Sequence, residues 1–176
     1  MKIEIKKSMK CVDYDVALKF LEKRVEDVIN RKKPELLWIL EHKPIFTAGT
    51  SSKENEILNK TINVSKTSRG GKITHHGPGQ KIVYFVLNLN ERGKDIRKLI
   101  KHIENCIIKI LKEYGIKSFN DKKNIGIWVN INGKAKKVAS IGIRVKRWIA
   151  FHGFSINISN NLEVYKNIVP CGIYSK

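Results

Sequence analysis

The stretch IGIWVNINGKAKKVASIGIRVKRWIAFHGFSINI, residues 125–158, decides the fold class. Apolar residues recur at every second position on both sides of Asn132-Gly133, which predicts strands over 125–131 and 134–145. The Asn-Gly pair predicts the two-residue turn of a β-hairpin between them. A further strand is predicted over 149–158. Strands that follow one another this closely indicate an antiparallel sheet.

The sequence before this stretch mixes helices and strands. Apolar residues at helical spacing predict helices over 15–31 and 96–114, with Asp13 as the N-cap of the first. The runs LLWIL at 36–40 and KIVYFVLNL at 81–89 predict buried strands. Because strands and helices do not alternate regularly, we predict an α+β fold with a mixed, mostly antiparallel sheet and flanking helices.

The composition fits one globular domain. The chain has 176 residues, of which 41% are hydrophobic, and this length suits one domain with a sizeable core over residues 1–176. No apolar run approaches the roughly 18 residues of a membrane span. The charged N-terminus MKIEIKKSMK lacks the apolar region of a signal peptide, so we expect a cytoplasmic protein.

The net charge of +19 has two interpretations. An acidic partner, either nucleic acid or protein, would favour such a surface. The abundance of Lys, Ile and Asn equally fits the codon bias of an AT-rich genome. The lysines are spread over the whole chain, without an arginine-rich arm or basic residues interleaved with aromatic ones, which argues against nucleic acid.

The segment RGGKITHHGPGQ, residues 69–80, does not fit a simple division into core and surface. It holds four glycines, a proline, two histidines and an arginine. Glycine permits positive φ angles and the close approach of a ligand to the backbone. Amides beside Arg69 could receive a carbonyl or a phosphate. A long surface loop of turn residues explains the same composition.

Cys171, in the segment IVPCGI, is a candidate nucleophile. The preceding proline restricts the backbone and the following glycine loosens it, so we expect a turn that presents the sulfur. A buried cysteine beside a chain bend is the alternative. We interpret Cys11 and Cys106 as structural. Three cysteines far apart in the sequence argue against a disulfide framework.

A cysteine nucleophile needs a base. Lys137 continues the apolar face of the predicted strand, and partial desolvation there would lower the pKa of its amine toward that of a base. A lysine at the sheet rim would instead keep its charge in water. His75, His76 and His152 are the other candidates, and the spacing does not choose among them. A glycine directly after His152 indicates close backbone approach within a strand.

Three ordered segments together resemble the lipoyl(octanoyl) transferases, the octanoyl-carrier-protein:protein transferases of lipoate biosynthesis. RGGKITHHGPGQ is similar to the glycine-rich signature of that family, KVASIGIRV followed by HGFSINI to its second signature, and PCG to its third. The stretch LWILEHKPIFTAG at 37–49 also matches. The resemblance therefore runs from residue 35 to residue 173.

The resemblance implies a biotin/lipoyl protein ligase-like fold and an acyltransferase. Cys171 would attack the thioester of octanoyl-acyl carrier protein and form an acyl-enzyme thioester. Lys137 would take the thiol proton and later a proton of the incoming lysine amine. The acceptors would be lipoyl domains of 2-oxoacid dehydrogenase complexes and the glycine-cleavage carrier protein. No metal, ATP or other cofactor is implied, and neither nucleic acid nor a membrane is an implied partner.

The resemblance also implies a set of residues that line the acyl and carbonyl site: Arg69, Gly70, Gly71, Lys72, Ile73, Thr74, His75, His76, Ser140, Ile141, Gly142, Gly153, Phe154 and Ser155. His75 stands where relatives often have an aromatic residue. Family members continue beyond the PCG segment with a further helical section, so we expect the catalytic domain to lack a C-terminal segment.

Other functions remain as alternatives. Lipoate–protein ligase shares the fold and activates free lipoate with ATP, but it has a longer glycine run and no need for Cys171. Octanoyl transfer without ATP would separate the two. A basic nucleic-acid-binding module and an inactive, truncated scaffold are the further alternatives.

Overall fold

This computed structural model describes residues 2–121 and 124–170. Its elements, with η for short 3₁₀ helices, are in chain order β1 (Ile3–Lys7), α1 (Tyr14–Ile29), β2 (Glu35–Leu40), β3 (Ile45–Ala48), η1 (Glu54–Glu56), β4 (Val64–Lys66), β5 (Ile73–His76), β6 (Gln80–Asn88), η2 (Leu89–Arg92), α2 (Ile96–Glu113), β7 (Ser118–Asn120), β8 (Ile127–Ile131), β9 (Lys134–Lys146), β10 (Ile149–Asn157) and η3 (Glu163–Asn167).

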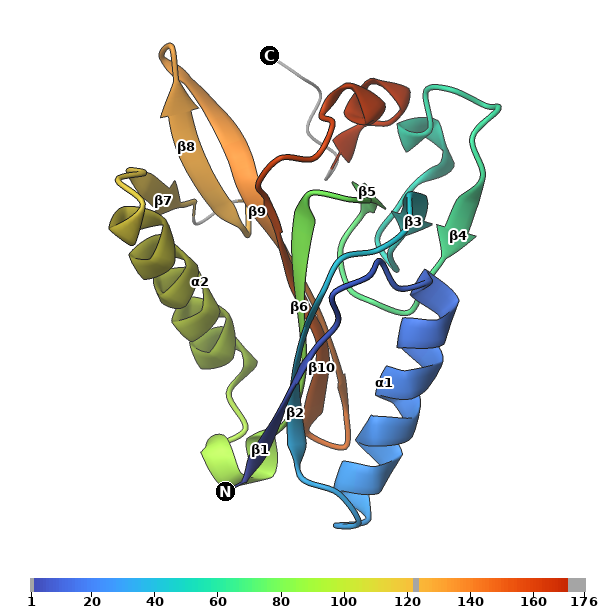
Figure 1. Cartoon of the computed structure of the whole chain (residues 1–176), viewed down its shortest axis with the longest axis vertical. Coiled ribbons are helices and arrows are strands. Elements are labelled where there is room, and N and C mark those ends of the chain that lie inside the picture. The colour runs from blue at the N-terminus through green and yellow to red at the C-terminus, as the bar shows by residue number, and fades with distance from the viewer. Residues whose placement is uncertain (1, 122–123, 171–176) are drawn as a thin grey trace.

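Within the described residues, the strands form two sheets. The larger has the order β1-β2-β6-β10-β9-β8-β7, and the smaller the order β4-β3-β5. In the larger sheet β1 pairs in parallel with β2, and every other neighbouring pair is antiparallel. The helices α1 and α2 lie on opposite faces of this sheet (Figure 1). The predicted α+β fold with a mixed, mostly antiparallel sheet is confirmed.

Each helix buries an apolar stripe against one face of the sheet. Leu21 and Val25 of α1 pack in one core cluster with Trp38 of β2. Ile107 of α2 packs in a second cluster with Phe85 of β6. The apolar positions of both helices recur at the helical period that the sequence shows, which is why both helices were predictable. None of the described helices has both the length and the apolar character of a membrane span.

The predicted hairpin forms between β8 and β9. Asn132 and Gly133 have φ angles of 51° and 77°, and positive φ at both central residues defines the turn that Asn-Gly favours. The pairing of β8 with β9 is irregular between Ile127 and Trp128, where the register shifts. The strand after the hairpin, β10, runs antiparallel beside β9 and carries its residues 153–155 into the region described below.

Two sequence expectations differ from the structure. Asp13 occupies the N-cap position of α1 but makes no side-chain cap hydrogen bond. Its carboxylate lies 3.0 Å from Nζ of Lys43, a contact between residues distant in the sequence. The glycine-rich segment is also not simply a surface loop, because its centre forms the buried strand β5, which pairs antiparallel with β3.

Candidate active site

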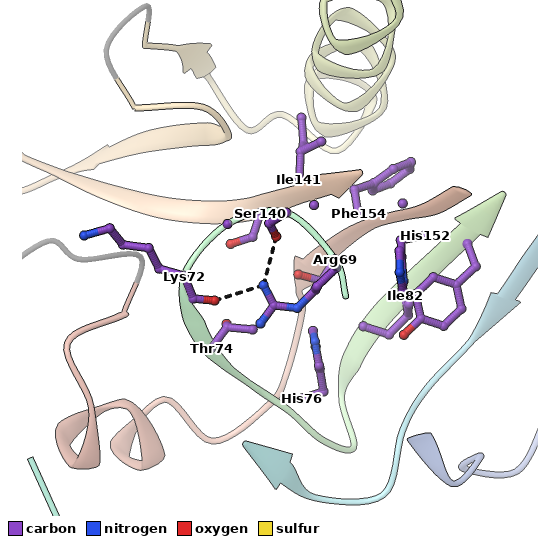
Figure 2. Close-up of a pocket in the computed structure, with 15 residues that line it drawn as sticks. Arg69, Lys72, Thr74, His76, Ile82, Ser140, Ile141, His152 and Phe154 are labelled. Atoms are coloured by element: carbon purple, nitrogen blue, oxygen red, sulfur yellow. Dashed lines mark hydrogen bonds between the residues drawn. The ribbon is translucent and has the colours of Figure 1, made fainter. Parts of the chain in front are cut away.

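A pocket lies where the glycine-rich segment meets β6, β9 and β10 (Figure 2). Its lining residues are Arg69, Gly70, Gly71, Lys72, Thr74, His76, Ile82, Tyr84, Ser140, Ile141, Gly142, His152, Gly153, Phe154 and Ser155. Every predicted substrate-binding residue is among them except Ile73 and His75. These two alternate with Thr74 and His76 along β5, so their side chains face the other side of the strand. Both are buried, and His75 packs against Phe46.

Three lining residues were not among the predicted substrate-binding residues: Ile82, Tyr84 and His152. Ile82 and Tyr84 stand two apart on β6, in a run that the sequence identifies only as a buried strand. His152 was considered as a base, and it is a buried residue with a left-handed φ of 67°. Left-handed backbone conformations of residues other than glycine are concentrated at functional sites. The φ angle of His152 is therefore a structural signal for this position.

Glycines bring the segment against the sheet. A Cβ atom at Gly70 would lie 2.9 Å from the carbonyl oxygen of Ile143, and one at Gly142 would lie 3.2 Å from the carbonyl oxygen of Gly70. Side chains at either position would push the segment away from β9. At Gly153 a Cβ atom would lie 1.9 Å from the carbonyl oxygen of Val83. The close backbone approach expected after His152 is confirmed.

The guanidinium of Arg69 forms hydrogen bonds within the glycine-rich segment and to β3. Nη1 donates to the carbonyl oxygens of Gly70 (3.1 Å) and Lys72 (2.9 Å), and Nη2 donates to the carbonyl oxygen (2.9 Å) and Oγ1 (2.8 Å) of Thr47. Figure 2 shows this side chain beneath the curve of the loop. Arg69 is 9% exposed. It therefore supplies a nearly buried positive charge at the pocket while its terminal nitrogens bind protein oxygens.

The histidines around the pocket are neutral. Burial, followed by the charge of Arg69, lowers the pKa of His76 to about 3 and that of His152 to about 4. Burial also lowers the pKa of His75. Imidazoles with such low pKa values are weak bases near neutral pH. They are poorly suited to take a proton from a thiol, which favours Lys137 among the predicted bases.

Lys137 lies on β9 three residues before the pocket-lining Ser140, and it does not itself line the pocket. Its side chain is half-buried, which is intermediate between a desolvated lysine and a lysine at the sheet rim with its charge in water. The Nζ atom donates to the carbonyl oxygen of Ile125 at 3.1 Å and lies 4.8 Å from the centroid of the Trp128 ring. The amine is therefore held by the residue Ile125, which precedes β8, and by the ring of Trp128 on β8.

Cys171 lies outside the described residues, but the segment leading to it is described. The amide of Val169 donates to the carbonyl oxygen of Glu56 at 2.7 Å. The hydroxyl of Tyr165 donates to the carbonyl oxygen of His75 at 3.2 Å. The described chain is thus fastened to β5 of the smaller sheet and to η1, which lies between β3 and β4.

The other cysteines are away from this site. Cys11 is half-buried and Cys106 is exposed on α2, and neither lines the pocket. Among the described residues, no group of three or more His, Cys, Asp or Glu side chains is placed to hold a metal ion.

The comparisons with known proteins agree with this geometry. The model of the lipoyl protein ligase A/B catalytic domain family matches residues 13–176. The octanoyltransferase of Wolbachia sp. subsp. Brugia malayi (strain TRS) is 43% identical over 163 residues, which are 92% of this chain and 80% of that protein. The octanoyltransferase of Ehrlichia ruminantium (strain Gardel) is 45% identical over 164 residues, 92% of this chain and 79% of that protein.

A solved structure supports the fold. A Thermoplasma acidophilum protein assigned as a lipoate protein ligase, with bound lipoic acid, superimposes with a TM-score of 0.71 at 13% identity. The match covers 96% of this chain and 73% of that one.

The chain belongs to the lipoyl protein ligase A/B catalytic domain family. Within it, the chain belongs with the octanoyltransferases, the acyltransferases that act in lipoate biosynthesis and protein lipoylation. The resemblance seen in the sequence is confirmed.

Proposed function

We propose that this chain, as one catalytic domain, transfers octanoyl groups from octanoyl-acyl carrier protein to a lysine of lipoyl domains through a thioester on Cys171. The acceptors would be lipoyl domains of 2-oxoacid dehydrogenase complexes and the glycine-cleavage carrier protein. The reaction would need no metal and no ATP, because a thioester is already an activated acyl group.

The transfer has two steps. In the first, Lys137 takes the proton of the Cys171 thiol, and the thiolate attacks the carbonyl carbon of the donor thioester. A new C–S bond forms, the old one breaks, and the carrier thiolate leaves with that proton. In the second step the acceptor amine attacks the enzyme thioester. A C–N bond forms, the C–S bond breaks, and Lys137 receives the proton that the amine releases.

The observation that carries this proposal is the attachment of the segment before Cys171. Val169 is bonded to Glu56, and Glu56 in turn holds Nζ of the pocket-lining Lys72 at 2.7 Å. The described chain is therefore fastened, two residues before Cys171, to a glutamate that also binds a pocket-lining lysine, and this supports Cys171 as the nucleophile of the proposal.

The apolar walls of the pocket suit an acyl chain. Ile82, Ile141 and Phe154 line it together with the ring of Tyr84. Burial of a hydrocarbon chain contributes about 0.8 kcal/mol for each CH₂ group. Over an eight-carbon chain this contribution is large enough to select acyl groups by length.

Intact-mass spectrometry tests the proposal. After incubation with octanoyl-acyl carrier protein and no ATP, the chain should gain the mass of one octanoyl group. Cys171→Ala should abolish the gain, and Cys106→Ala, which changes an exposed thiol, should retain it. A gain that persists in Cys171→Ala, or that requires free octanoate and ATP, would refute the proposed route and favour a ligase.

A further inference from the structure

The side chain of Gln80 joins the pocket to the segment that leads toward Cys171. Gln80 is 1% exposed. Its Oε1 lies 2.6 Å from Nδ1 of His76. Its Nε2 faces three oxygens: Oδ1 of Asn157 at 2.8 Å, the hydroxyl of Tyr165 at 3.0 Å and the carbonyl of His75 at 3.3 Å.

These contacts fix the orientation of the amide. The carbonyl oxygen of His75 can only accept a hydrogen bond, so the nitrogen of the Gln80 amide must face it. The oxygen of the amide then faces His76, and an amide oxygen also only accepts. Nδ1 of His76 must therefore be the donor. In a neutral imidazole the other nitrogen, Nε2, then has no proton and presents a lone pair.

This lone pair belongs to a ring that lines the pocket (Figure 2). Among the described residues, no donor forms a hydrogen bond with Nε2 of His76. Burial, together with the nearby Arg69, holds the pKa of this imidazole at about 3, so the ring stays neutral and Nε2 remains an acceptor near neutral pH. An acceptor that borders the pocket can receive a hydrogen bond from a donor group that enters it.

We propose that Gln80 holds His76 as the Nδ1–H tautomer, so that Nε2 accepts a hydrogen bond from the amine of the incoming acceptor lysine. The inference rests on the proposed function. An octanoyl group has no N–H or O–H bond, and the Cys171 thiol loses its proton in the first step. The amine is the donor that must enter in the second step. The bond to Nε2 orients the lone pair of the amine toward the thioester carbon. The proton that the amine releases still goes to Lys137.

Nuclear magnetic resonance on the wild-type protein tests the tautomer. The ¹⁵N shifts of the two ring nitrogens, read from long-range ¹H–¹⁵N correlations at neutral pH, distinguish a protonated from an unprotonated nitrogen. His76 is assigned as the signal that disappears in His76→Asn. We expect a protonated Nδ1 and an unprotonated Nε2. A protonated Nε2 would overturn the inference.

The variant His76→Asn tests the role in transfer. The asparagine amide can donate to Gln80 as Nδ1 does, but it places no acceptor where Nε2 lies. With preformed octanoyl-enzyme, transfer to a lipoyl domain should slow by about 10- to 100-fold, as for a lost hydrogen bond to a polar or charged group. Acylation of Cys171 by the carrier thioester should slow much less than this transfer step.

The matched control is Asn161→Asp, which changes an exposed amide near η3 and preserves its acceptor for the amide of Glu163. It should transfer at the wild-type rate. Wild-type transfer by a folded His76→Asn refutes the inference, as does an equal slowing of both steps. If His76→Asn does not fold, the tautomer measured in the wild type decides. Failure of wild-type Cys171 to become acylated would instead refute the proposed function.

Discussion

Replacing Lys137 by methionine should nearly abolish acylation of Cys171 while leaving the protein folded. The change removes a hydrogen bond to Ile125 and a cation–π contact with Trp128. Such interactions contribute about 0.5–1.5 and 0.5–1 kcal/mol in partly exposed positions. Methionine keeps most of the apolar stem, so the loss of stability should be at most the sum of the two upper values, about 2.5 kcal/mol. From the lower end of usual stabilities, about 5 kcal/mol, this leaves about 99% of the molecules folded.

The catalytic effect is expected to be far larger than that fraction. Loss of a general base slows proton transfer by about 10²- to 10⁴-fold, and acylation of Cys171 should fall by a factor in this range. The assay is the single-turnover gain of octanoyl mass, with thermal unfolding of the same samples. Lys136→Met is the matched control, because Lys136 is the exposed neighbour on the opposite face of β9. Wild-type acylation by Lys137→Met would refute the assignment. Lys137→Arg keeps a positive charge but does not release its proton, so activity in this variant would exclude proton transfer and leave only a charge effect.

Acid should destabilise the protein through His76, because an imidazole whose pKa is lowered to about 3 on folding is protonated first in the unfolded chain. Its contribution to stability is complete above a pH of about 6.5 and falls by roughly 1.4 kcal/mol for each pH unit below. The free energy of unfolding, measured with urea at pH 7 and pH 5, should show this fall. The fall should be smaller in His76→Asn. If the charge of +19 steers an acidic carrier protein, raising the salt concentration should raise the KM for that carrier, and an unchanged KM would contradict steering. Gly142→Ala should slow transfer with little loss of stability, because its Cβ would meet the carbonyl oxygen of Gly70 at 3.2 Å. Gly153→Ala should greatly lower the melting temperature, because its Cβ would lie 1.9 Å from the carbonyl oxygen of Val83. If the two variants changed the transfer rate and the melting temperature equally, this reasoning would be contradicted.

Local signals made most of the fold predictable. Helical spacing located α1 and α2 to within two residues at each end. Asn132-Gly133 located the β8–β9 hairpin because its turn needs positive φ angles at both central residues, which Asn and Gly tolerate. The smaller sheet was not predictable in this way. Strand β5 has four residues, and its strand structure depends on pairing with β3, which lies about 28 residues earlier. The side chain of Asp13 likewise pairs with Lys43, which is distant in the sequence, and does not cap its own helix.

The site was predictable as a set of segments but not as a set of side chains. The ordered motifs bring Arg69, Ser140 and Gly153 to one pocket, although they lie on three different elements. Sequence could not say which face of β5 or β6 would border that pocket, so Ile73 was included and Tyr84 was omitted. A strand in the centre of a fold is apolar on both faces, and its pattern does not distinguish a core neighbour from a pocket.

The electrostatic character of the pocket supports acyl transfer in a further way. None of the described lining residues is acidic, and the carboxylate of the buried Glu56 is paired with Lys72. The charge of Arg69 adds to burial in lowering the pKa values of His76 and His152. The same charge acts on every group that enters. It favours a thiolate and the oxyanion formed during attack, and it favours an incoming amine over the corresponding ammonium. A pocket of this sign would therefore help to deliver the acceptor lysine in the uncharged form that attack on a thioester requires, and its neutral histidines would not compete for the proton.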